Sequence, residues 1–117
     1  MKVPKLLLVL VTLLLAAPAY AQGVQVKETA PGQLKRAKIT PDAAMATARK
    51  LVPKGKIVSA EIEDEDGKLI YSFDMRTAGK SGIDEVNVDA ITGKGTAQHE
   101  APSAEAKEKA ADLKKKP

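Results

Sequence analysis

An Asp-Gly pair at positions 66 and 67 separates two runs in which apolar and polar residues alternate. Asp-Gly strongly indicates a two-residue β-hairpin loop, because both residues tolerate a positive φ. The pair predicts strands over residues 56–64 and 68–76. A register shifted by one residue would turn Glu61 and Glu63 toward the core. The facing pairs that the loop predicts are Asp64–Leu69, Ile62–Tyr71, Ala60–Phe73 and Val58–Met75.

A third strand is predicted over residues 83–90, where Val86 and Val88 alternate with polar residues. Placing Val86 opposite Phe73 and Val88 opposite Tyr71 continues the apolar side of the hairpin. Residues 94–100 are expected to return as a short fourth strand. The expected buried side consists of Val58, Ala60, Ile62, Leu69, Tyr71, Phe73, Met75, Val86, Val88 and Ala90.

A helix is predicted to precede these strands. Thr40 is a favourable N-cap, Pro41 suits the first helical position, and Pro53 ends the helix. Ala44, Ala48 and Leu51 recur at helical spacing and are expected to face the sheet. The sequence thus predicts an α+β fold, in which one N-terminal helix packs on an antiparallel sheet of three to four strands.

The two ends of the chain differ from this central part. Residues 1–21 read as a secretory signal peptide, with Lys2 and Lys5 before an apolar run and Ala19-Tyr20-Ala21 as the cleavage site. The expected location is therefore periplasmic or secreted, after cleavage following Ala21, with no membrane span in the mature chain. Residues 22–38 are predicted to be a leader or linker, mostly irregular with an extended piece at 24–26. Residues 101–117 form a charged tail, expected to be disordered or partly helical, after a domain at 39–100.

Composition limits the function further. Removal of the first 21 of 117 residues leaves 96 residues, enough for one core, and cysteine is absent. The formal charge of +4 falls to +2 once Lys2 and Lys5 are removed. Such a small positive charge does not support nucleic-acid binding.

Alternation places a group of carboxylates on the side of the sheet opposite the helix. The group consists of Glu61, Glu63, Asp74, Glu85 and Asp89. We call these five residues the acidic face. Its ordinary interpretation is a solvated sheet surface. Two functional interpretations remain open: a docking surface for a basic partner, and a weak cation site.

Catalytic and cofactor chemistry finds little support in the sequence. The single histidine, His99, has no predicted set of converging metal ligands around it, and the serines lie in no nucleophile motif. Asp89 ends a strand before Thr92-Gly93, where its carboxylate is expected to accept hydrogen bonds from backbone N–H groups of the turn. We therefore expect no enzyme activity, no catalytic residue, no metal site and no cofactor.

Three segments in this order resemble the PepSY domain family. They are the Thr40-Pro41 start of the alanine-rich helix, Gly67 followed by Tyr71, and the Val86–Gly93 strand and turn. The resemblance covers residues 37 to 100 and implies a helix packed on an antiparallel sheet, export from the cytoplasm and a non-catalytic role. Members of this kind have been proposed to inhibit or regulate peptidases. One difference is that Gly95-Thr96-Ala97 follow Lys94, where members often continue with apolar residues.

The predicted function is that of a periplasmic binding or regulatory module. Its partner is expected to be a protein or peptide, such as a peptidase or another envelope protein. The alternative is a cation-binding or buffering protein that uses the acidic face.

Overall fold

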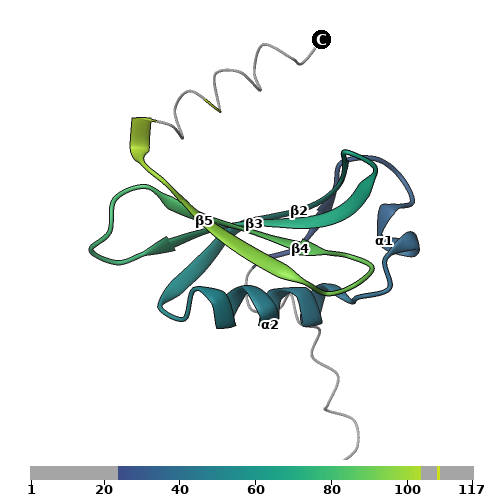
Figure 1. Ribbon diagram of the computed structural model, residues 1–117, viewed down its shortest axis with the longest axis horizontal. Coiled ribbons are helices and arrows are strands. Elements are labelled where there is room, and N and C mark those ends of the chain that lie inside the picture. Colours follow the sequence, from purple (N-terminus) through teal and green to yellow (C-terminus); the bar gives the residue numbers. More distant parts are fainter. Residues whose placement is uncertain (1–23, 104–107, 109–117) are drawn as a thin grey trace, which may run out of the picture.

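The computed structural model describes residues 24–103 and residue 108. The elements are β1 (Lys27–Glu28), α1 (Gln33–Arg36), α2 (Pro41–Leu51), β2 (Gly55–Glu65), β3 (Lys68–Thr77), β4 (Ile83–Asp89) and β5 (Gly95–Glu100). The five strands form one sheet in the order β1-β2-β3-β4-β5. Helix α2 lies across one side of this sheet, and α1 lies near one end (Figure 1).

The β2–β3 hairpin has the predicted loop. Asp66 and Gly67 have φ values of 50° and 78°, both in the left-handed region that Asp-Gly tolerates. Three of the predicted facing pairs are confirmed: Asp64–Leu69, Ile62–Tyr71 and Ala60–Phe73.

The fourth predicted pair, Val58–Met75, is wrong. Ile57 faces Met75 and Ser59 faces Asp74, so Val58 is the extra residue of a β-bulge. The bulge reverses the alternation, and Ile57 is buried whereas Val58 is 48% exposed. Two consecutive apolar residues at 57 and 58 allow either one to point inward.

Strand β4 pairs with β3 as predicted, with Val86 opposite Phe73 and Val88 opposite Tyr71. The expected fourth strand is present as β5, which is antiparallel to β4. Among the described residues, the sheet therefore contains the predicted antiparallel part, and β1 adds a parallel strand at the β2 edge.

Helix α2 begins at the predicted cap, where the Thr40 side chain accepts a hydrogen bond from the Ala43 N–H at 3.2 Å. Its buried residues are Ala44, Met45 and Ala48, and the small alanines allow close approach to the sheet. Leu51 was expected on this face but is 41% exposed. The buried side continues to Val52, one residue later, which packs against the core.

The core lies between α2 and the sheet. Tyr71 and Phe73 are fully buried and stack with ring centroids 6.2 Å apart. The Tyr71 hydroxyl donates a hydrogen bond to the Ile39 carbonyl at 2.6 Å, which satisfies its polar end, while burial raises the pKa of this phenol.

The segment before α2 is more ordered than the leader that the sequence predicts. It contains β1 and α1, and Val26 belongs to the core. The fold is α+β as predicted, but it has two helices and a mixed five-stranded sheet in place of one helix and three to four antiparallel strands.

The predicted signal peptide at 1–21 and most of the predicted tail at 101–117 lie outside the described residues. Within the part that is described, no helix combines the length and the hydrophobicity needed to cross a membrane.

Candidate functional site

The predicted acidic face is assembled by the register of β2, β3 and β4. In one row across the sheet, Ser59 faces Asp74 and Asp74 faces Glu85. In the next row, Glu61 faces Ser72, and in the third Ile70 lies between Glu63 and Asp89. Figure 1 shows α2 on the opposite side of this sheet.

Glu85 is the carboxylate most affected by its surroundings. It is partly buried and lies directly opposite Asp74. Burial raises the pKa of Glu85 to about 7, and the nearby charges of Glu108 and Asp74 act in the same direction.

Two further glutamates extend the negative charge toward the end of β5. Carboxylate oxygens of Glu85, Glu100 and Glu108 all lie within 4.8 Å of one another. The pKa of Glu100 is raised to about 7, chiefly by its hydrogen bond with Glu108 and also by burial. Sequence reasoning missed this convergence, because alternation within a strand does not reveal which distant residue lies over it.

Asp89 has the structural environment that the sequence predicts. Its Oδ1 accepts hydrogen bonds from the Ile91 N–H at 2.8 Å and the Thr92 N–H at 3.0 Å. These bonds, first that of Thr92, lower the pKa of Asp89. Gly93 completes the turn with a φ of 82°. The Asp89 carboxylate is therefore committed to the turn.

His99 pairs with Asp84, which lies outside the predicted acidic face. The Nδ1 atom of His99 lies 2.9 Å from Oδ1 of Asp84, which is only 9% exposed. The Nζ atom of Lys80 lies 3.7 Å from the other oxygen of Asp84. Among the described residues, no hydroxyl group hydrogen-bonds to His99.

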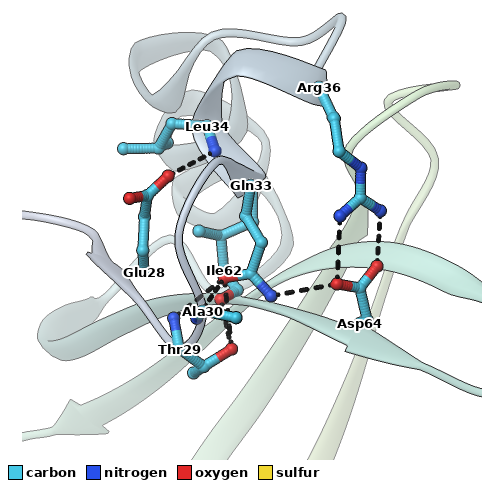
Figure 2. A network of polar contacts seen from close by, with 8 residues as sticks. All are labelled: Glu28, Thr29, Ala30, Gln33, Leu34, Arg36, Ile62 and Asp64. Carbon is cyan, nitrogen blue, oxygen red and sulfur yellow. Dashed lines mark hydrogen bonds and ion pairs between the residues drawn. The ribbon is translucent and has the colours of Figure 1, made fainter.

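A second polar cluster joins the segment before α2 to strand β2 (Figure 2). The Oε1 atom of buried Gln33 accepts hydrogen bonds from the N–H groups of Thr29 and Ala30, each at 2.9 Å. Its Nε2 atom donates to Asp64 at 3.1 Å. Arg36 donates two hydrogen bonds to the same carboxylate, at 3.1 and 2.5 Å. The cluster holds β1 and α1 against the sheet.

The Arg36 hydrogen bonds, followed by that of Gln33, lower the pKa of Asp64 to about 2. Asp64 therefore stays ionised over the ordinary pH range. Its contacts attach the N-terminal segment to β2.

Comparison with protein-family models matches residues 38–99 to the PepSY family, described as "Peptidase propeptide and YPEB domain". The match covers more than half of the 117 residues. The chain belongs to the PepSY family. The resemblance inferred from the helix cap, the hairpin and the closing turn is thereby confirmed. Searches of curated proteins and of solved structures found no significant match.

PepSY domains are generally non-catalytic modules of a regulatory or propeptide-like type. The matched region of this PepSY protein includes α2 and strands β2 to β4, whereas β1 and α1 precede it. The segment attached through Gln33 and Arg36 is therefore an addition outside the matched region.

Proposed function

We propose that this PepSY protein is a non-catalytic binding module of the cell envelope. In this proposal it regulates a peptidase or another envelope protein by docking a basic surface of that partner on the acidic face. Export follows cleavage after Ala21, so that the mature chain begins at Gln22. Amino-terminal sequencing of the protein from the envelope fraction tests the export step.

The proposal rests on the distribution of charge between the two sides of the sheet. Helix α2 packs on one side, while Glu61 and the partly exposed Glu63 and Asp74 lie on the other. Like charges face each other where Asp74 lies opposite Glu85, an arrangement that costs stability in the isolated protein. A basic partner would relieve this repulsion and would gain association rate from the negative field.

The experiment is capture of partners from the envelope fraction with the purified protein as bait. The triple variant Glu61→Gln, Glu63→Gln, Asp74→Asn should lose the partner that the wild type captures. The control is Asp42→Asn, which removes a carboxylate from the first turn of α2. Equal capture of the partner by the wild type and the triple variant would reject docking on the acidic face.

A second candidate function, cation binding, is favoured by the convergence of Glu85, Glu100 and Glu108. Calcium takes oxygen ligands, and a bound cation would offset the repulsion among these carboxylates, which adds to the effect of burial on the pKa of Glu85. Calcium should then raise the melting temperature of the wild type but not that of Glu85→Gln, Glu100→Gln. If calcium leaves the melting temperature of the wild type unchanged, cation binding at this site is excluded.

A further inference from the structure

The two outer edges of the sheet differ. The outer edge of β2 is covered over a short stretch, where β1 pairs in parallel with Glu61 and Ile62. The outer edge of β5 pairs with no strand among the described residues. Residues 96–99 of β5 are all exposed. Among the described residues, one edge is thus partly covered by the chain itself, and the other is left without a paired strand.

The backbone of β5 presents unpaired groups at this edge. The carbonyl of Lys94 accepts a hydrogen bond from the Asp89 N–H at 2.9 Å. This bond determines which residues of β5 direct their backbone groups toward β4. Backbone groups alternate in direction along an antiparallel pair, and β5 pairs with β4 without a register shift. The N–H and C=O groups of Gly95, Ala97 and His99 thus point away from β4.

This edge also lacks the features that usually prevent strand addition. Natural edge strands are commonly protected by lysine, proline or a bulge. Strand β5 has the sequence Gly-Thr-Ala-Gln-His-Glu, with neither lysine nor proline. By contrast, β2 has a bulge at Val58 besides the cover that β1 provides.

A cleft lies beside the same edge, on the α2 side of the sheet. It has a volume of about 390 Å³ and is bounded by the end of α2, the β3–β4 connection and β5. Leu51, Val52 and Ala97 form an apolar wall, with Leu51 41% exposed. Lys54 and Lys80 also line the cleft.

The charges in the cleft favour an acidic group. The carboxylate of Asp84 already contacts His99 and Lys80. Lys54 forms no ion pair with any residue in the described ranges, and Lys80 is itself half exposed. An incoming carboxylate would therefore meet two lysines, whereas an incoming cation would find the Asp84 carboxylate occupied.

We propose that the β5 edge binds an extended peptide strand of another protein by strand addition. The backbone of the peptide pairs with Ala97 and His99. Side chains on one side of the added strand enter the cleft, an apolar one against Leu51 and Val52 and, two residues away, an acidic one beside Lys54 and Lys80. Main-chain hydrogen bonds supply affinity in such complexes, and alternate side chains supply specificity.

A second copy of this chain fits the site poorly. Pairing of β5 with itself would direct only Gly95, Ala97 and His99 toward the α2 side of the sheet. None of these residues offers a large apolar side chain or a carboxylate to the cleft. The strand-addition site is also separate from the acidic face, so failure of either proposal leaves the other unaffected.

The test is selection of random twelve-residue peptides displayed on phage against the protein, expressed from its full-length gene and purified in the form that the cell produces. Selected peptides should share an apolar and an acidic residue two positions apart. Synthetic versions should bind to Ala97→Pro at least about tenfold more weakly, because the substitution removes an N–H group and adds a ring at the edge. Thr96→Ala is the control, because it keeps every backbone N–H group and Thr96 does not line the cleft.

A measurement on the wild type avoids any dependence on folding of the proline variant. Bound peptide should slow hydrogen exchange of the Ala97 and His99 amides. The proposal is overturned if no such peptide is selected, if both variants bind equally, or if exchange of these amides is unchanged. A concentration-dependent dimer that Ala97→Pro abolishes would also overturn it, because the edge would then belong to a second copy.

Discussion

Substitution of Gln33 by alanine should detach the N-terminal segment from the sheet. In the wild type, Gln33 is 1% exposed and its amide group makes hydrogen bonds to Thr29, Ala30 and Asp64. Thr29 has a second acceptor for its N–H group in the Ile62 carbonyl at 3.1 Å. Loss of the Gln33 side chain therefore leaves mainly the Ala30 N–H group without a partner.

The magnitude follows from these contacts. The part-buried hydrogen bonds of Gln33 to Ala30 and Asp64 contribute about 0.5–1.5 kcal/mol each, or about 1–3 kcal/mol together. Removal of the Gln33 methylene from the interior adds about 0.8 kcal/mol. We expect Gln33→Ala to lower the free energy of unfolding by about 2–4 kcal/mol, or to release β1 and α1 if their attachment to the sheet is weaker than that.

Urea denaturation measures the change in the free energy of unfolding, and hydrogen exchange locates it. Exchange of the Ala30 amide should accelerate at least about thirtyfold, the factor that corresponds to about 2 kcal/mol. Amides within β3 should remain the more protected ones. The matched control is Gln98→Ala on β5, which removes an exposed glutamine and should leave both measurements near wild type.

An unchanged denaturation midpoint together with unchanged Ala30 exchange in Gln33→Ala would refute this reasoning. The N-terminal segment would then be held by β1 pairing and apolar contacts alone.

Three further predictions concern the core, the closing turn and pH. Tyr71→Ala or Phe73→Ala should lower the free energy of unfolding by about 3–5 kcal/mol and leave the domain largely unfolded. If circular dichroism shows both variants melting at the wild-type temperature, the core assignment is wrong. Gly93→Val should lower the melting temperature, because a β-branched residue resists a φ of 82°. Asp89→Asn should lower the melting temperature less. A larger decrease for Asp89→Asn than for Gly93→Val would contradict the turn geometry. The folded-state pKa of Glu85 is about 7 against an ordinary 4.5, so the folded state retains the proton longer, and stability should fall as pH rises from 4.5 to 7. Glu85→Gln should flatten this part of the pH profile of melting temperature, and a profile of unchanged slope would contradict the raised pKa.

Much of the sheet could be predicted because short-range rules determine it. The Asp66-Gly67 loop sets the register of β2 and β3, and alternation then assigns Ile62 and Tyr71 to one side. Val58 was misassigned because a bulge changes the alternation without a distinctive residue type. Leu51 was misassigned because the last turn of a short helix can place either of two adjacent apolar residues inward.

The features that sequence reasoning missed depend on contacts between distant residues. Gln33 and Asp64 are 31 positions apart, and Asp84 and His99 are 15 positions apart. No local pattern marks a glutamine that will be buried, although the alternation of Val24 and Val26 signals an extended piece that places Val26 in the core. The acidic face could be predicted from alternation, whereas the approach of Glu108 to Glu85 could not.

The salt dependence of partner binding tests the central claim most directly. The dissociation constant of the complex with the captured envelope protein would be measured over a range of NaCl concentrations, for the wild type and for Glu61→Gln, Glu63→Gln, Asp74→Asn. Charges at an exposed interface are screened over about 8–10 Å at moderate salt. Docking on the acidic face predicts that wild-type affinity falls steeply with NaCl and that the triple variant binds weakly with a shallower dependence. Wild-type affinity that is independent of salt, or a triple variant with the same affinity and slope, would contradict it.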